Sequence, residues 1–166
     1  MSIALGRCVA ETMAVVEAGA AEARRLGRPW VGTEHFLFGF AGEHRALVSD
    51  AAASVLPTAT VVRAGLGSAV EAGAVGWVER RRRPWRRARR CGTPAPSDDL
   101  RLAPRAKEAL HNAARHSERR GAGAIEPVDL LLGIVDVAES RANQVLADAG
   151  VAPGQLRAAL RDPTGQ

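Results

Sequence analysis

Tyrosine is absent from the sequence, and aromatic residues of any kind are scarce. Aromatic residues make up 4% of the 166 residues, whereas alanine, leucine and arginine are abundant, and this mixture favours helices over strands. Hydrophobic residues make up 46% of the chain, which is enough to bury the core of one ordinary domain or of two small modules. We therefore expect an all-α protein.

Cysteine is also rare, and its placement argues against metal and disulfide frameworks. Cys8 and Cys91 are far apart, and neither belongs to a CxxC pair or to a cluster with histidine. Both are most simply interpreted as free thiols.

Histidines do not form a metal-binding motif either. The four histidines are His35, His44, His111 and His116, and the chain has no H-E-x-x-H motif. We expect no bound metal and no cofactor.

Motifs of catalysis and of nucleotide binding are missing as well. The chain contains no G-x-S-x-G elbow. Its one lysine, Lys107, lies in "PRAKEAL", so a G-x-x-x-x-G-K-[ST] loop that cradles phosphates cannot form. We therefore expect a protein that is not an enzyme.

Long uninterrupted apolar runs are absent too. The first 27 residues, "MSIALGRCVAETMAVVEAGAAEARRLG", have no charged segment before an apolar stretch, and Glu11 and Glu17 interrupt the only candidate. We expect neither a signal peptide nor a membrane span, no membrane partner, and a cytoplasmic protein.

Positive charge is concentrated in one segment, "RRRRPWRRARR" at 80–90. The formal net charge is +5, and eight arginines lie in this segment, so the rest of the chain carries a net charge of −3. The segment either is a solvated linker or binds an acidic protein or the phosphates of a nucleic acid. Candidate polyanion contacts are Arg80, Arg81, Arg82, Arg83, Arg86, Arg87, Arg89 and Arg90.

The chain repeats itself at an offset of 94 residues. This offset brings "LGRPWVGTEHFLFGF" (26–40) onto "RGAGAIEPVDLLLGI" (120–134). It also places "VRAGL" (62–66) on "LRAAL" (156–160) without a gap. A match over about 60 residues on each side indicates two copies of one helical unit.

Each unit is predicted to begin with a long amphipathic helix. These helices span Val9–Leu26 and Pro104–Arg120, since proline suits the first helical position and Gly27 and Gly121 suit the position just past the end. The spacing predicts an apolar helix next (Thr33–Ala41 and Pro127–Val137), followed by a helix of small residues and a last short helix. Four helices per unit give about eight in all.

The domain organisation follows from this repeat. We expect a first helical repeat at 1–72, an arginine- and proline-rich linker at 73–103, and a second, divergent repeat at 104–166. The two repeats together are expected to form one globular domain with pseudo-twofold symmetry.

A long helix ending in "EARRLG", followed by a short turn and "VGTEHFLFGF", resembles the Clp repeat of the N-terminal domain of Clp-family AAA+ unfoldases. "LAPRAKEAL" at 102–110 is similar to the start of the second repeat in that family. The resemblance implies a domain that receives substrate proteins and adaptors and has no chemistry of its own. The ATPase motor is not encoded in this chain, which predicts a free-standing module.

In some members of that family, the glutamate of "GTEH" helps to bind phosphoarginine, a mark on proteins destined for degradation. On this resemblance, Thr33 and Glu34 are candidate ligand-binding residues of the first repeat. The equivalent residues of the second repeat are Pro127 and Val128, and Asp129 lies one position late, so we expect the second site to be inactive. From the residues alone, Thr33 is also a candidate N-cap of its helix.

Three hypotheses remain for the function. The first is a protein- or peptide-binding module that acts as an adaptor, competitor or decoy for Clp ligands such as phosphoarginine-marked proteins or cyclic peptides. A groove near Leu102 and Pro104 is expected to take part. The second is a nucleic-acid-associated protein that uses the arginine segment at 80–90. The third is a degenerate repeat that binds another subunit.

Overall fold

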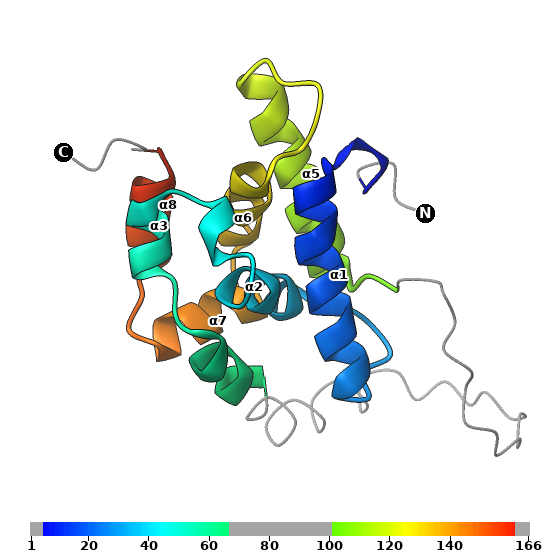
Figure 1. Cartoon of the computed structure of the whole chain (residues 1–166), viewed down its shortest axis with the longest axis vertical. Coiled ribbons are helices and arrows are strands. Elements are labelled where there is room, and N and C mark those ends of the chain that lie inside the picture. Colours follow the sequence, from blue (N-terminus) through cyan, green and yellow to red (C-terminus); the bar gives the residue numbers. More distant parts are fainter. Residues whose placement is uncertain (1–4, 67–100, 162–166) are drawn as a thin grey trace, which may run out of the picture.

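The computed structural model describes residues 5–66 and 101–161, and helices account for all of its regular elements (Figure 1). In chain order they are η1 (Leu5–Arg7), α1 (Ala10–Arg25), α2 (Thr33–Ala41), η2 (Arg45–Leu47), α3 (Asp50–Val55), α5 (Pro104–Arg119), α6 (Pro127–Val135), α7 (Arg141–Asp148) and α8 (Pro153–Arg161). Residues 59–66 are helical as well. The predicted all-α class is confirmed. None of the described helices is long and apolar enough to span a membrane.

The predicted tandem repeat is confirmed by the helix boundaries. A shift of 94 residues carries both ends of α1 onto α5 and both ends of α2 onto α6. The third helices, α3 and α7, start three residues out of this register, and each is capped by a serine hydroxyl, from Ser49 or Ser140. The register returns in the last helices, where Val62 and Leu156 are both buried at equivalent positions.

The two repeats are joined by reciprocal backbone pairing of their connecting segments. Cys8, just before α1, pairs with Ile125, just before α6, and Leu102, just before α5, pairs with Val31, just before α2. The 94-residue shift exchanges the two pairs, which is the signature of a pseudo-twofold axis between the repeats. The hydrogen bonds run from Val9 N to Ile125 O (3.1 Å), Ile125 N to Arg7 O (2.8 Å), Ala103 N to Val31 O (2.9 Å) and Val31 N to Arg101 O (2.7 Å).

The apolar helices α2 and α6 lie in the middle of the molecule, with α1 on one side and α3 and α8 on the other (Figure 1). Each packs on the long helix of its own repeat, α2 on α1 and α6 on α5, and α7 packs across the repeats on α2. The fully buried residues of these two helices are Phe36, Leu37, Phe40, Leu130, Leu131 and Ile134. Each of these large side chains contributes about 1.5–3 kcal/mol when it is fully buried.

Glycine allows this packing to be close. A Cβ on Gly39 of α2 would collide with the carbonyl oxygen of Val15 on α1, and one on Gly133 of α6 would collide with that of Ala109 on α5. The two contacts are again related by the 94-residue shift. The sequence alignment of Gly39 with Gly133 therefore reflects the same backbone contact in each repeat.

The glycines predicted just past the ends of the long helices are confirmed. Gly27 and Gly121 adopt left-handed backbone angles, with φ of 65° and 73°, and each lies two residues after the last residue of its helix. The helices α1 and α5 are each slightly shorter than predicted, and α6 ends at Val135 rather than at 137. The predicted linker at 73–103 lies largely outside the described residues, so its bounds remain a prediction.

An ionic link ties the last helix of each repeat to the long helix, but the residues differ. In the first repeat, Glu22 of α1 pairs with Arg63 at 2.9 Å and with Arg25. Hydrogen bonding by Arg25, together with Arg63, outweighs burial and lowers the pKa of Glu22 to about 2. Glu22 is only 4% exposed, so this carboxylate is held ionised inside the protein.

In the second repeat, His116 takes the position of Glu22 and Arg157 that of Arg63. Asp136, at the end of α6, joins them: its carboxylate lies 2.7 Å from His116 Nε2 and 2.7 Å from an Arg157 nitrogen. Burial acts to raise the pKa of Asp136, but the hydrogen bonds from His116 and Arg157 outweigh it and lower the pKa. The acid has thus moved from the long helix to the end of the apolar helix.

Replacing Gly39 or Gly133 with alanine tests the close helix packing. We expect each variant to lower the free energy of unfolding by about 1–3 kcal/mol, because the added methyl group collides with backbone rather than with a flexible side chain. Urea denaturation measures this loss. Gly154→Ala in α8 is the matched control, since a Cβ there meets nothing within 4 Å. Equal stability of Gly39→Ala and Gly154→Ala would show that the helices can separate freely.

Candidate functional site

The start of α2 is built differently from the sequence-based prediction. Gly32, with extended backbone angles, occupies the N-cap position, and Thr33 is the first helical residue. The prediction that Thr33 caps the helix is therefore wrong. The Thr33 hydroxyl is buried and instead accepts a hydrogen bond from the backbone N–H of Ala142, at 3.3 Å. Thr33 thereby joins the start of α2 to the start of α7.

His35 supplies the cap that Thr33 does not. Its Nδ1 accepts a hydrogen bond from the Gly32 N–H at 3.0 Å, as the third helical residue does in a capping box. A nitrogen that accepts this bond carries no proton, which assigns the remaining proton of the neutral ring to Nε2. Burial lowers the pKa of His35 below its usual value. The buried Nε2 has no hydrogen-bond partner among the described residues.

Glu34 lies on the surface side of this cap, with 19% of its side chain exposed. Its carboxylate folds back over Gly32, where a Cβ would collide with it. One carboxylate oxygen is 3.3 Å from His35 Nδ1. This contact is not an ion pair, because Nδ1 already accepts the Gly32 N–H and the ring is neutral. Within residues 5–66 and 101–161, no arginine or lysine forms an ion pair with Glu34.

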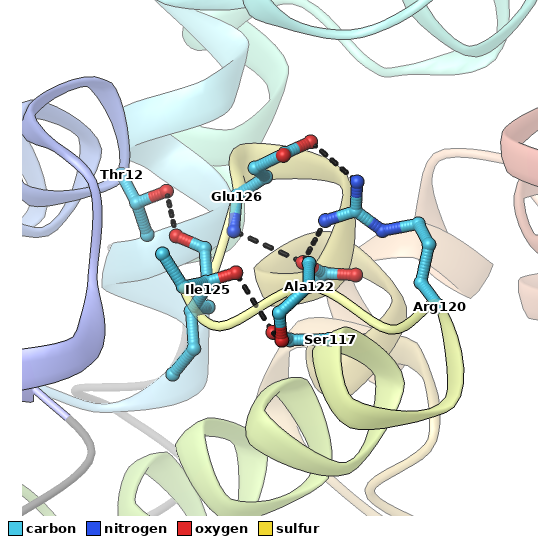
Figure 2. A network of polar contacts seen from close by, with 8 residues as sticks. Thr12, Ser117, Arg120, Ala122, Ile125 and Glu126 are labelled. Carbon is cyan, nitrogen blue, oxygen red and sulfur yellow. Dashed lines mark hydrogen bonds and ion pairs between the residues drawn. The ribbon is translucent and has the colours of Figure 1, made fainter.

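The second repeat presents a different solution at the equivalent place. Glu126 takes the position of Gly32 and Asp129 that of His35, and the Asp129 carboxylate accepts the Glu126 N–H at 3.0 Å. Arg120 reaches from the end of α5 to both acids, 2.8 Å from Glu126 and 2.7 Å from Asp129 (Figure 2). The acidic start of α6 therefore binds a guanidinium group from its own chain.

The loop that carries Arg120 is fixed from two sides (Figure 2). The Thr12 hydroxyl donates to the Ile125 carbonyl at 2.9 Å, and the Ser117 hydroxyl contacts the carbonyls of Ala122 and Ala124 at 2.9 and 2.7 Å. These bonds hold the segment between α5 and α6 in place. Arg120 is thus presented to the start of α6 by an ordered loop.

Arg120 and His35 were missed at the sequence level, although the repeat alignment contained the signal. The 94-residue shift places His35 on Asp129 and Leu26 on Arg120. His35 and Asp129 each lie three positions after an N-cap, which is where a capping box places the side chain that accepts the N-cap N–H. A search for this pattern would have found both residues. The expected displacement of Asp129 relative to Glu34 agrees with the structure, since Asp129 is buried and engaged in the cap.

Arg141 lies at the start of α7, next to Thr33. Its guanidinium donates to Gln144 Oε1 at 2.8 Å and to the Gly65 carbonyl at 3.1 Å. Its Nε is buried and has no hydrogen-bond partner among the described residues, and no aspartate or glutamate of that part of the chain forms an ion pair with it. Among the described residues, this positive side chain therefore has no acidic partner, and it lies at the positive end of α7.

The remaining predicted site residues are placed as follows. Leu102 pairs with Val31 and packs partly against the core, and Pro104 is exposed at the first position of α5. The groove predicted beside them remains a prediction. The arginines at 80–90 and Cys91 lie outside the described residues. Burial raises the pKa of Cys8 to about 11, so this thiol stays protonated at neutral pH.

Metal-ligand side chains do not gather anywhere in the described part of the chain. No group of three or more histidine, cysteine, aspartate or glutamate residues there could hold a metal ion.

Among the large apolar side chains of the described residues, Trp30 is the most exposed, at 58%, and it lies two residues before the cap of α2.

Comparison with known proteins supports the resemblance seen in the sequence. Residues 101–166 match the family model described as the Clp repeat (R) N-terminal domain. The solved N-terminal domain of the caseinolytic protease associated chaperone ClpD from Arabidopsis thaliana is 22% identical, with a TM-score of 0.67 over 94% of this chain and 96% of that chain. A structure from a malarial protein secretion system is 15% identical, with a TM-score of 0.62 over 96% of this chain and 97% of that chain. No curated protein matches the chain.

A duplicated, all-helical domain with a pseudo-twofold axis is the class that the fold defines. The chain carries a Clp repeat domain, identified directly in residues 101–166, and its fold is that of a Clp N-terminal domain. Such a domain is a protein-binding module of the Clp type.

Replacing Arg120 with alanine tests the internal neutralisation of the second repeat. Asp129 is 2% exposed, and without Arg120 its carboxylate retains only the Glu126 N–H. We expect the free energy of unfolding to decrease by about 1–3 kcal/mol because a buried charged group loses its partner. Arg119→Ala, which removes the exposed neighbouring arginine, is the control for charge alone. Equal losses in both variants, measured by urea denaturation, would contradict the assigned role.

Proposed function

We propose that the chain is a non-enzymatic protein-binding module that captures ligands otherwise received by Clp ATPases, and that it acts as an adaptor, competitor or decoy. We further propose that Glu34, at the start of α2, holds the guanidinium group of a phosphoarginine-type ligand. The observation that carries this proposal is the contrast between the two helix starts: Arg120 neutralises the acids at α6, whereas Glu34 at α2 has no such partner among the described residues.

The second repeat supports the choice of a guanidinium ligand. There, one arginine side chain contacts two carboxylates at the start of an apolar helix, at 2.7 and 2.8 Å. Charge-assisted bonds between carboxylates and guanidinium are strong and directional. In the first repeat the position of Arg120 is taken by Leu26, which cannot neutralise an acid. A guanidinium group from a ligand would neutralise Glu34 in the first repeat, as Arg120 neutralises the two acids in the second.

The neighbouring α7 supports a phosphate group on that ligand. Thr33 joins the starts of α2 and α7, so Glu34 and Arg141 belong to adjoining helix ends. Helix starts attract anions. Arg141 adds a full positive charge without an acidic partner among the described residues. A ligand with a guanidinium and a phosphate would thus meet Glu34 and Arg141 respectively. In the second repeat, Pro127 takes the position of Thr33. Proline has no hydroxyl, so it cannot accept a hydrogen bond of the kind that joins Thr33 to Ala142.

The arginines at 80–90 are assigned no role in this proposal. A nucleic-acid partner remains a separate prediction for that segment, and a chain lacking residues 80–90 would separate it from ligand capture.

Glu34→Gln tests the guanidinium contact. Loss of one charge without change of shape should weaken phosphoarginine binding at least tenfold, since charge-assisted hydrogen bonds contribute about 1.5–3 kcal/mol. Isothermal titration calorimetry at pH 7.5 and physiological salt measures the change. Glu43→Gln, which removes an exposed acid just after α2, is the matched control and should bind normally. Equal affinity of the Glu34→Gln variant and the parent would remove Glu34 from the site.

Arg141→Gln tests the phosphate contact separately. We expect this variant to lose its preference for phosphoarginine over arginine while it still binds arginine, because only the phosphate contact is removed. Arg141→Lys, which keeps the charge, should retain part of the preference. Thermal melts of each variant verify folding, since Arg141 also holds Gly65 and Gln144. An unchanged preference in Arg141→Gln would place the phosphate elsewhere.

A further inference from the structure

His35 is an unexpected residue for its position. The equivalent residue of the second repeat, Asp129, caps its helix with a carboxylate that is also neutralised by Arg120. His35 caps α2 only in its neutral form, and it leaves Nε2 buried without a partner among the described residues. A buried polar atom without a hydrogen bond costs stability, so the cap alone does not account for a histidine there.

The position of Glu34 supplies a second role. His35 Nδ1 lies 3.0 Å from the Gly32 nitrogen and 3.3 Å from a Glu34 carboxylate oxygen. The neutral nitrogen accepts from Gly32 and has nothing to donate to Glu34. The protonated nitrogen can no longer accept from Gly32, but it becomes a donor within reach of Glu34.

We propose that His35 is a proton-operated switch on Glu34: the neutral ring leaves the carboxylate to an external guanidinium, and the protonated ring takes the carboxylate for itself and releases the ligand. This regulation rests on the proposed ligand site at Glu34. One proton from solvent is bound for each ligand released, and no other reactant is needed.

The charged groups around His35 are consistent with a switch below neutral pH. Burial acts most strongly and lowers the pKa of His35 from its usual 6.5; Glu34 on the same helix and Glu22 on α1 act to raise it, and Arg28, between α1 and α2, lowers it. From the neighbouring α7, Arg141 is directed to Gly65 and Gln144. The ring is therefore neutral at pH 7.5 and becomes charged on acidification.

The first experiment needs no ligand. NMR titration of the histidine ring protons gives the titration midpoint of His35 in the full chain, with exposed His111 as the internal reference. Glu34→Gln should lower the His35 midpoint, because it removes the carboxylate that stabilises the charged ring, and should leave His111 unchanged. An unchanged His35 midpoint would overturn the switch, whatever the ligand proves to be.

The second experiment measures phosphoarginine affinity from pH 7.5 to pH 5.5 in the parent and in His35→Gln. Glutamine at this position still accepts the Gly32 N–H but cannot be protonated. The dissociation constant of the parent should rise by up to tenfold per pH unit below the His35 midpoint, and that of His35→Gln should rise less. Both proteins meet the same titration of the phosphate, so their difference isolates His35.

The outcomes separate the two proposals. Binding at pH 7.5 with the same pH dependence in both proteins overturns the switch and leaves the ligand site standing. Absence of phosphoarginine binding at pH 7.5 overturns the ligand site, and with it the release of that ligand, even where Glu34→Gln shifts the His35 midpoint.

Discussion

The close contact of each apolar helix with the long helix of its own repeat is the constraint on which the rest of the domain depends. Gly39 and Gly133 let the backbones of α2 and α6 lie against carbonyl oxygens of α1 and α5. The reciprocal pairing of Val31 with Leu102 and of Ile125 with Cys8 holds the segments that lead into both helices. Contacts between backbones therefore position both helix starts, and the hydroxyls of Thr12, Thr33 and Ser117 add side-chain hydrogen bonds there.

On this symmetric frame, the two repeats differ in how their charges are satisfied. At the start of α6, two acids are neutralised by Arg120 from within the chain. At the start of α2, a neutral histidine makes the cap and Glu34 has no basic partner in the described residues. The ionic links of the last helices differ as well, with Glu22 in one repeat and His116 with Asp136 in the other. Duplication thus preserved the packing, while the polar positions diverged.

Much of the fold could be predicted from the sequence because packing leaves periodic signals. The 94-residue offset, the apolar runs and the paired glycines each report a backbone contact or a buried face, and the structure has them where expected. The end of α6 was predicted too late, because Val137 is buried after the helix has ended. An apolar pattern reports burial, and it does not distinguish the last turn of a helix from a packed loop.

The candidate site was less predictable, since it depends on which hydrogen bond each polar side chain makes. Thr33 had the chemistry of an N-cap, but Gly32 occupies that position, His35 accepts the Gly32 N–H, and Thr33 binds α7. Arg120 pairs with Asp129 across the loop between α5 and α6, and the conformation of that loop decides whether the two side chains meet. The composition of the sequence does not reveal this conformation.

The most direct test of the account is a map of backbone amide shifts during titration of the parent with phosphoarginine. A single functional site predicts saturation at one ligand per chain, with shifts at Gly32 and Glu34 at the start of α2 and at Ala142 on α7. No shifts are expected at Glu126 or Val128 at the start of α6. Shifts centred on α6, or two ligands per chain, would contradict the claim that only the first repeat is open to an external ligand.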